Sequence, residues 1–364
     1  MGTVVYIESF GNPHETWLYR QVKDCAVPVL CHEYSNEDLF PYNAVDVVPK
    51  RPGAHARFRG RYRLPRSTER ALKRKLRDLG ATLIHAHFGP AGLRALPLAR
   101  KLGLRLMVTF HGADANVLPD RDAAYARGLS GLFDYSERIV AVSGFLAARL
   151  VGLGCPEERI EIVPMGVGLP RIPARRKRKT IRAVTVARLH PVKGVPDLVD
   201  AVAAARSQDV PLELDIVGEG PERHAIEERV RKLDLQKVVR LHGSLPPPEI
   251  EPLLLAADLF VLNSRPTDSE DVDGLPVSLL EGMAAGLCVL GTRAGGVPEV
   301  VQHEQNGLLV PARDTEALAA LLVRAAGDRD LRLRLGKAAR ATVAAEFGAH
   351  PTAGRLLELY EVPA

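Results

Sequence analysis

The residues best suited to chemistry lie around one loop and one short apolar run in the second half of the chain. Acidic residues lead to Asp273 and Gly274, and an apolar run from Pro276 to Met283 follows. This run predicts a short buried helix, because proline suits the first helical position, where its missing N–H costs no hydrogen bond. The free amides and positive dipole end of such a helix favour an anion, most naturally a phosphate, in front of Gly274.

Two carboxylates belong to this motif. Asp273 stands just before the predicted helix, and Glu281 lies one to two turns into it. The loop interrupts the helical count, so spacing alone does not place the two side chains on one face. Two interpretations stay open: a pair of ligand-binding acids, or an N-terminal cap at Asp273 and an ordinary helix acid at Glu281. Gly286 would cap the C-terminus of the helix, and an apolar strand over 288–291 follows.

Two cations occupy another loop of the same half. Arg188 and Lys193 are five residues apart and follow a predicted strand over 182–186. Cations at this spacing can converge on one diphosphate. Glycines also follow the next two predicted strands, Gly218 after 212–217 and Gly243 after 238–242.

The first half carries a second group of polar residues at strand ends. His87 ends a predicted strand over 83–87, and His111 and Asp114 follow the next strand, over 106–110. Doubly wound sheets bind ligands just past the carboxyl ends of their strands. A single histidine there is more often structural, but two adjacent loops of this kind favour a function. Near the N-terminus, Gly11 is free to take a positive φ and Glu15 opens a predicted helix.

Alternating strands, loops and helices indicate an α/β protein. The 364 residues are enough for two domains of ordinary size. We predict an N-terminal domain over 1–170, a basic linker over 171–179 and a second domain over 180–346. The amphipathic tail, 347–364, looks like a final helix.

The four cysteines, Cys25, Cys31, Cys155 and Cys288, show no metal-binding spacing and predict reduced thiols in a cytoplasmic protein. No apolar stretch approaches the roughly 20 residues that span a bilayer, and the N-terminus lacks a signal-peptide pattern.

Charge is unevenly distributed along the chain. The net charge is +12 up to Lys179 and −7 beyond it. The densest positive segment runs from Lys50 to Arg77, with Glu69 as its only acid. A solvated charged face is one interpretation. The other is contact with an anionic membrane surface or a phosphate-bearing acceptor. No recognised nucleic-acid-binding motif is present, so we expect no nucleic-acid partner.

Ordered motifs over nearly the whole chain resemble the family 4 retaining glycosyltransferases of the GT-B fold, and look closest to the bacterial exopolysaccharide and lipopolysaccharide branch. The motifs are ETW after FGNPH, AHFGPAG, VTFHGAD, VAVSGFLAARL, VPMGV, VARLHPVKG, IVGEGP, LHGSLP, AADLFVLNS and GLPVSLLEGMAAGLCVLGT with GGVPEVV. The resemblance implies two Rossmann-like domains facing across a cleft, with the last helix returning to the first domain.

The resemblance also implies roles for individual residues. Arg188 and Lys193 match the pair that holds the donor diphosphate, and His111 matches the histidine that reaches the donor sugar. Asp273 and Glu281 match the E-x7-E motif, whose first acid contacts the sugar and whose second accepts bonds from the ribose. The remaining implied positions are Gly274, Leu275, Val277, Gly218 and Gly243 on the donor side, and Gly11, Glu15, His87 and Asp114 on the acceptor side.

Three departures from the family pattern matter. Asp273 replaces the glutamate and is one methylene shorter, so the loop would have to move in by about 1 Å, and misplacement on that scale can cost about 100-fold in rate. The N-terminal loop lacks the Gly-Gly of many relatives, and Gly168 stands where an acid usually follows.

The predicted reaction moves a sugar from a UDP- or GDP-linked donor to a hydroxyl of a glycan or lipid-linked acceptor. We expect no metal and no other cofactor, and we assign no general base. Asp271 and Asp273 match a metal-binding pattern only through the Asp273 change. The alternatives are a nucleotide-sugar-binding subunit without activity, and an epimerase or hydrolase of the same fold that needs no acceptor. We predict a cytoplasmic protein that contacts the inner face of the membrane through Lys50 to Arg77.

Overall fold

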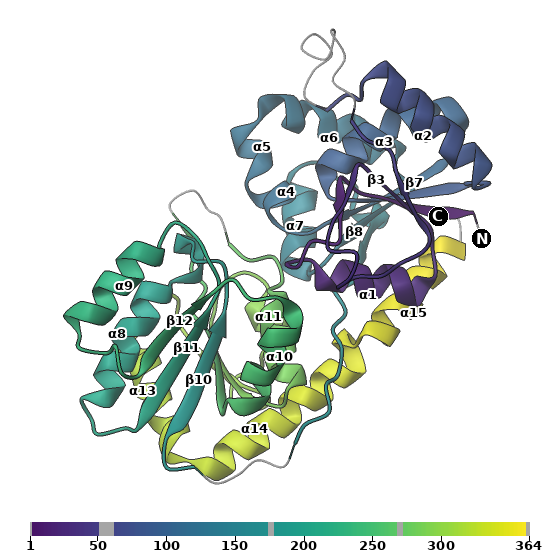
Figure 1. The fold of residues 1–364 in the computed structure, drawn as a ribbon. Coiled ribbons are helices and arrows are strands. Elements are labelled where there is room, and N and C mark those ends of the chain that lie inside the picture. Colours follow the sequence, from purple (N-terminus) through teal and green to yellow (C-terminus); the bar gives the residue numbers. More distant parts are fainter. Residues whose placement is uncertain (1, 51–61, 174–177, 268–271, 362–364) are drawn as a thin grey trace. The chain divides into compact units, whose positions relative to one another are not determined.

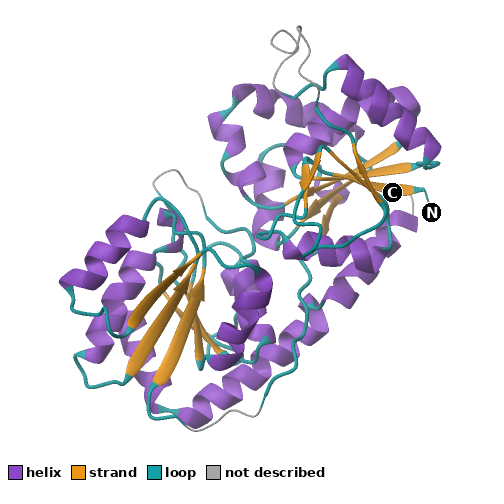
Figure 2. Ribbon diagram, viewed as in Figure 1, coloured by secondary structure: helices purple, strands orange, loops and turns teal. Residues whose placement is uncertain are grey.

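The computed structural model describes residues 2–50, 62–173, 178–267 and 272–361. The chain divides into two compact units, one formed by Met1–Gly166 with Ala349–Ala364 and the other by Val167–Gly348. Each unit is built on a parallel sheet with helices packed against it (Figure 1, Figure 2).

The first unit contains a seven-stranded sheet in the order β5-β3-β1-β6-β7-β8-β9 and a small separate pair, β2 with β4. Its strands are β1 (Thr3–Tyr6), β2 (Ser9–Phe10), β3 (Val29–Cys31), β4 (Glu33–Tyr34), β5 (Val45–Val47), β6 (Leu83–His87), β7 (Arg105–Phe110), β8 (Arg138–Ala141) and β9 (Ile160–Ile162). Its helices are α1 (Thr16–Cys25), α2 (Arg66–Asp78), α3 (Gly89–Leu102), α4 (Ala113–Asn116), α5 (Leu118–Arg121), α6 (Ala123–Tyr135), α7 (Gly144–Gly152) and α15 (Ala349–Glu361).

The second unit contains a six-stranded parallel sheet in the order β12-β11-β10-β13-β14-β15. Its strands are β10 (Ile181–Val186), β11 (Leu212–Val217), β12 (Val239–Gly243), β13 (Leu259–Leu262), β14 (Cys288–Thr292) and β15 (Leu308–Val310). Its helices are α8 (Val195–Arg206), α9 (Arg223–Lys232), α10 (Pro247–Ala256), α11 (Val277–Ala284), α12 (Val297–Val300), α13 (Thr315–Gly327) and α14 (Arg329–Thr342).

The central strands are short and apolar because helices cover them. Every residue of β6, β13 and β14 is buried, as expected for parallel strands with both faces covered. In both strand orders the first strand of the unit, β1 or β10, lies in the interior of the sheet. Successive strands are therefore added first on one side of it and then on the other. The carboxyl ends of the strands therefore share one edge in each unit, and the loops that follow them lie together at that edge.

The last helix, α15, packs against α1 in the first unit. Its Tyr360 hydroxyl lies 2.8 Å from His85 Nδ1, and both side chains are buried. Because His85 belongs to the central strand β6, this contact joins the end of the chain to the middle of the first sheet.

One helix start differs from the sequence prediction. The helix expected from Pro276 begins at Val277, because Pro276 has φ −78° and ψ 109° and serves as the N-cap. At the end of α11, Gly286 follows the C-cap residue Ala285 and takes φ +67°, a conformation that favours glycine.

The four cysteines are buried and form no disulfide. Within the residues that the structure describes, no helix is both long and apolar enough to cross a bilayer.

Candidate functional site

Lys193 and Asp273 meet at the carboxyl edge of the second sheet. Lys193 ends the loop after β10, and Asp273 precedes α11, yet the Lys193 Nζ lies 2.6 Å from Asp273 Oδ1. Their side chains are only 10% and 14% exposed. This places the Lys193 ammonium beside Gly274, at the start of α11, where the sequence predicts an anion.

Arg188 occupies the other end of the Lys193 loop. Its side chain is exposed and makes no hydrogen bond or ion pair with any residue that the structure describes. The loop backbone is fixed, since the Leu189 N–H donates to the Glu219 carbonyl at 2.8 Å. A cation that is free on an anchored loop can bind an anion without breaking an existing ion pair.

Two predicted donor-side glycines shape this loop. A Cβ on Gly218 would lie 1.9 Å from the Ala187 carbonyl oxygen, so the close approach requires glycine. The Gly218 N–H also donates to the Gly243 carbonyl at 2.8 Å, and Gly243 takes φ +74°. Gly218 and Gly243 thus connect the loops after β10, β11 and β12 and hold Arg188 in place.

The start of α11 presents free backbone amides. The amides of Gly274, Leu275, Val277 and Ser278 have no hydrogen-bond partner among the described residues, and Pro276 has none to offer. Four N–H groups at a helix start remain without intrahelical partners. Together with the dipole, these amides can stabilise a phosphate.

Glu281 is the fifth residue of α11 and is partly buried. It lies just over one turn from the helix start, so it shares a face with Val277 and Ser278. The side chain of Asp273 points instead to Lys193, and its second oxygen accepts from the Ser264 hydroxyl at 2.5 Å.

The first unit brings His87 and His111 together at the ends of β6 and β7. Their rings are stacked with centroids 5.4 Å apart, and His87 Nδ1 lies 3.2 Å from His111 Nε2. Burial lowers the pKa of His87 to about 3 and that of His111 well below its usual value, so both imidazoles are neutral at pH 7.

The hydrogen bonds of these rings define their tautomers. The Gln21 amide nitrogen lies 3.3 Å from His87 Nε2 and donates to it, so the His87 proton is on Nδ1 and is donated to His111 Nε2. The His111 proton is then on Nδ1, which is buried and has no partner among the described residues. His111 therefore offers one unused N–H donor.

Aromatic side chains hold His111 in place. Trp17 of α1 packs on the His111 ring with centroids 4.3 Å apart, and Phe88 does so at 4.4 Å. Phe88 has φ +72°, which is unusual for a bulky residue and fits strain at a functional site. Trp17 and Gln21 share one face of α1, since they are four residues apart.

Asp114 is buried and its carboxylate binds backbone amides. Its Oδ1 accepts from the N–H groups of His111 and Gly112 at 3.0 and 2.9 Å, and its Oδ2 from Gly89 at 3.0 Å. Burial raises the pKa of Asp114, while these bonds favour the ionised form. The carboxylate thus joins the loop after β7 to the start of α3 and orients His111.

Gly11 and Glu15 lie in the loop before α1. A Cβ on Gly11 would lie 1.9 Å from the Ser35 carbonyl oxygen, and Gly11 has φ +82°. Glu15 is the N-cap residue of α1, but its side chain caps no amide. Burial raises the pKa of Glu15 to about 7, so this carboxyl is poised between its two protonation states near neutral pH.

Within the basic segment, the structure describes Lys50 and residues 62–77; residues 51–61, with Arg57, Arg59 and Arg61 among them, lie outside the described residues. Its helix α2 buries Thr68, Leu72 and Leu76. Four arginines with no described partner are exposed on the opposite side, at a spacing of one turn: Arg66, Arg70, Arg74 and Arg77.

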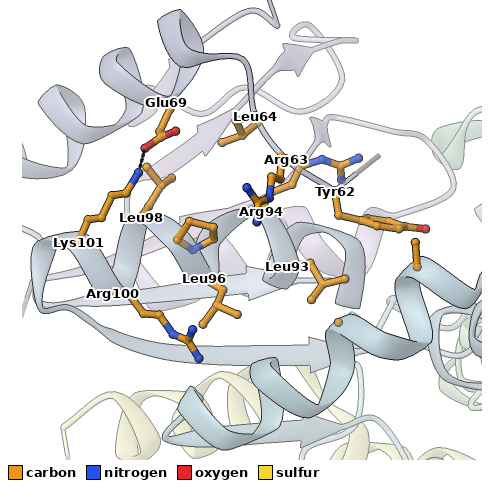
Figure 3. A pocket seen from close by; sticks show the side chains of 13 residues that line it. Tyr62, Arg63, Leu64, Glu69, Leu93, Arg94, Leu96, Leu98, Arg100 and Lys101 are labelled. Atoms are coloured by element: carbon orange, nitrogen blue, oxygen red, sulfur yellow. Dashed lines mark hydrogen bonds and ion pairs between the residues drawn. The ribbon is translucent and has the colours of Figure 1, made fainter. Parts of the chain in front are cut away.

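A cavity of about 600 Å³ lies beside α2 (Figure 3). Leu93, Leu96 and Leu98 of α3 form its apolar part, and Arg100 and Lys101 line it with positive charge. None of the predicted donor-side or acceptor-side residues lines this cavity. It is thus separate from the two loop clusters.

Both halves of the chain match glycosyltransferase families. Residues 20–171 match Glycosyltransferase Family 4, and residues 171–342 match the glycosyl transferases of group 1. The amylovoran biosynthesis glycosyltransferase AmsK of Erwinia amylovora is 32% identical over 294 residues, which cover 78% of this chain and 71% of AmsK. The chain therefore belongs to glycosyltransferase family 4 and is a glycosyltransferase.

Other relatives agree with this assignment. A GDP-mannose-dependent alpha-(1-6)-phosphatidylinositol monomannoside mannosyltransferase of Mycobacterium tuberculosis is 30% identical over 288 residues, 74% of each chain. The crystal structure of Anabaena Alr3699/HepE in complex with UDP and glucose superposes with a TM-score of 0.83 at 18% identity, over the full length of both chains. Sucrose-phosphate synthase of Thermosynechococcus elongatus gives a TM-score of 0.80. The fold is therefore GT-B, with two Rossmann-like domains.

No group of three or more histidine, cysteine, aspartate or glutamate side chains suited to a metal ion occurs among the described residues. Asp271, the other acid of the Asp-x-Asp pattern, lies outside them.

Four residues of these clusters were not predicted: Trp17, Gln21, Phe88 and Ser264. Gln21 and Trp17 are set against the histidines by α1, and their i, i+4 spacing was the available signal. Ser264 lies just beyond β13 and binds Asp273, and no local pattern distinguishes it from other serines.

Proposed function

We propose that this enzyme transfers a sugar, with retention of anomeric configuration, from a nucleoside-diphosphate sugar to an acceptor hydroxyl. The observation that carries the proposal is the grouping of Lys193, exposed Arg188 and the free amides of α11 at one edge of the second sheet. Two cations and a helix start suit a diphosphate that gains negative charge as it leaves. Glu281, on the same face of α11 as Val277 and Ser278, would accept hydrogen bonds from the ribose.

In the proposed reaction, the bond between the sugar's anomeric carbon and the diphosphate oxygen breaks, and a bond from that carbon to the acceptor oxygen forms on the same face. The acceptor proton passes to the departing phosphate, so no separate base is needed. The unused His111 N–H would donate to a hydroxyl of the transferred sugar. Glu15 and Gly11 belong to the acceptor side.

The donor test uses Arg188→Ala and Lys193→Ala. Removing one such electrostatic contact typically costs about 10²–10³-fold in turnover, so each variant should lose that much with a UDP- or GDP-sugar. Turnover near the wild-type level in both variants would contradict the proposed diphosphate site.

Two other functions would give different products. A binding subunit without activity would bind nucleotide sugars in calorimetry but give no turnover with lipid-linked acceptors. An epimerase or hydrolase would convert the nucleotide sugar without an acceptor. Product analysis with and without acceptor separates all three. A thermal-shift panel of nucleoside diphosphates and their sugars would identify the donor, because a ligand that binds the folded form raises its apparent stability.

We further propose that the acceptor is a lipid-linked or cell-surface glycan and that α2 contacts the anionic face of a membrane. The exposed Arg66, Arg70, Arg74 and Arg77 support the contact, since each basic residue near such a surface contributes about 1 kcal/mol. The adjacent cavity, with leucines and cations in its lining, suits part of an anionic lipid.

The membrane contact is tested by flotation with anionic and neutral vesicles. Arg70→Glu with Arg74→Glu should weaken binding to anionic vesicles by about tenfold or more, and added salt should do the same. The matched control is Arg231→Glu with Lys232→Glu, two exposed cations of α9. Equal binding to neutral vesicles would rule out the electrostatic contact.

A further inference from the structure

Asp273 replaces the family glutamate that contacts the transferred sugar. Both its side chain and its backbone are hydrogen-bonded to neighbouring residues. Its Oδ1 accepts a hydrogen bond from the Lys193 ammonium at 2.6 Å, and its Oδ2 accepts one from the Ser264 hydroxyl at 2.5 Å. The Ser264 side chain is fully buried, and Lys193 is 9% exposed. The carboxylate therefore faces the interior of the loop cluster.

The backbone of Asp273 is also fixed. Its carbonyl accepts from the Gly296 N–H at 3.1 Å. Gly295 packs so closely that a Cβ there would lie 2.0 Å from the same oxygen. The inward shift of about 1 Å that a shorter side chain would need to reach a sugar would break this contact and both side-chain bonds.

Lys193 requires this partner. A buried ammonium is strongly disfavoured unless it is paired and hydrogen-bonded. The ammonium has three N–H donors, so it can keep Asp273 and still donate to a diphosphate. The bond to the Asp273 carboxylate also restricts the rotamer freedom of the long, flexible Lys193 side chain.

We propose that Asp273 is a positioning residue, which holds the Lys193 ammonium at the diphosphate site and does not contact the transferred sugar. This inference rests on the proposed donor site. Ser264 orients the second oxygen of Asp273, and the Thr292 hydroxyl in turn donates to the Ser264 carbonyl. The loops after β10, β13 and β14 are thereby linked around one ammonium.

The test is a double-mutant cycle with Lys193→Met and Asp273→Asn, measured by calorimetry with UDP, GDP and their sugars. If Asp273 acts through Lys193, Asp273→Asn should weaken nucleoside diphosphate binding roughly tenfold in the wild-type background. In the Lys193→Met background the same substitution should have no effect on binding. The loss should be the same for a nucleoside diphosphate and its sugar, because the sugar is not contacted.

Three results would overturn the inference. The first is that Asp273→Asn weakens the binding of nucleotide sugars but not of nucleoside diphosphates. The second is that Asp273→Asn still weakens binding in the Lys193→Met background. The third is that Asp273→Asn strengthens diphosphate binding, which would mean that the carboxylate competes with the ligand. Failure of the wild-type protein to bind any nucleoside diphosphate would instead defeat the proposed donor site itself.

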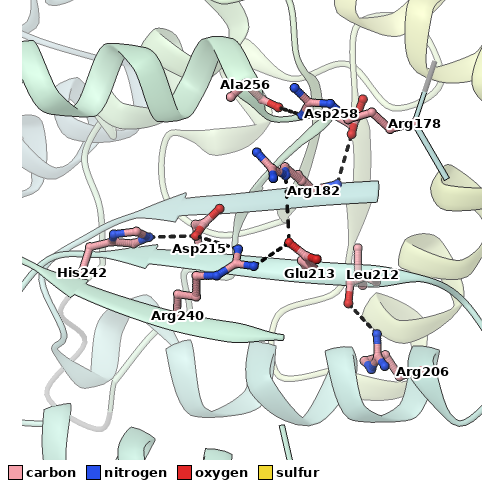
Figure 4. Close-up of polar contacts among 10 residues, drawn as sticks. All are labelled: Arg178, Arg182, Arg206, Leu212, Glu213, Asp215, Arg240, His242, Ala256 and Asp258. Atoms are coloured by element: carbon pink, nitrogen blue, oxygen red, sulfur yellow. Dashed lines mark hydrogen bonds and ion pairs between the residues drawn. The ribbon is translucent and has the colours of Figure 1, made fainter. Parts of the chain in front are cut away.

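A matched control comes from the ion pairs on the strands of the same sheet. Arg240 donates to Glu213 at 2.9 Å, near the start of β11 and thus away from the carboxyl edge (Figure 4). Glu213→Gln removes a carboxylate of the same unit and should leave diphosphate binding unchanged. Thermal unfolding of each variant confirms that it is folded.

Discussion

At the scale of single residues, the hydrogen bonds that His87 and His111 can offer in the first unit depend on which ring nitrogen carries the proton. Neutral His87 and His111 form a chain with Gln21 that leaves the His111 Nδ1–H unused. A neutral imidazole can donate from only one nitrogen, so a residue that does not touch substrate can still decide what His111 offers.

Gln21→Glu should reverse this chain. A carboxylate accepts a hydrogen bond from a protonated His87 Nε2, so His87 Nδ1 becomes an acceptor for the His111 Nε2–H, and His111 Nδ1 no longer carries a hydrogen. We expect kcat/KM to fall about tenfold, the value of one hydrogen bond, with nucleoside diphosphate affinity unchanged. Gln21→Met, which removes the donor without supplying an acceptor, is the control and should cost less. Equal losses would contradict the tautomer assignment.

Glu15 makes stability depend on pH. Its pKa rises through burial from 4.5 to about 7 in the folded state, so between these values the folded protein binds more protons than the unfolded chain. Stability should therefore fall as pH rises from about 4.5 to 7, by at most about 3 kcal/mol. Glu15→Gln should remove this slope, as followed by urea unfolding at pH 5 and 8. Parallel pH profiles for the two proteins would contradict it.

At the scale of elements, α15 completes the first unit. The Tyr360 hydroxyl contacts buried His85, whose other nitrogen lies 2.7 Å from the Thr109 hydroxyl. Burial lowers the pKa of His85 well below its usual value, so the ring stays neutral.

Tyr360→Phe should leave a buried nitrogen of His85 without a partner. The expected loss of unfolding free energy is about 1–3 kcal/mol, the penalty for an unsatisfied buried polar group. Chemical denaturation measures it. Tyr135→Phe, which removes a bond to the Leu104 carbonyl at a partly exposed site, should cost less. A smaller loss in Tyr360→Phe than in Tyr135→Phe would show that the α15 contact is dispensable.

At the scale of the whole molecule, the two units carry separate clusters. We expect a saturating nucleoside diphosphate to slow amide hydrogen exchange around Arg188, Lys193 and the start of α11 in the second unit, because binding stabilises the folded form of the loops that make contact. Without a sugar, the loops of His87 and His111 should exchange as before. Slower exchange in the histidine loops alone would indicate that the diphosphate binds the first unit, which would contradict the proposed donor site.

Much of the fold follows from sequence because its signals are local. The strands β6 and β11 were predicted with the observed bounds, and α11 and its loop were predicted to within a residue. Apolar runs between glycine turns are set by neighbours in the chain, so no tertiary information is needed to find them. Pro276 was assigned one position too far into the helix, since proline suits both the N-cap and the first turn.

The sequence by itself determined that this chain is an α/β glycosyltransferase of family 4, and it predicts which loops bind the phosphate. Only the tertiary structure decided the partners of the side chains. Lys193 and Asp273 are 80 residues apart, Gln21 and His87 are 66 apart, and His85 and Tyr360 are 275 apart. Strand order and loop packing bring such pairs together, and no local periodicity encodes them.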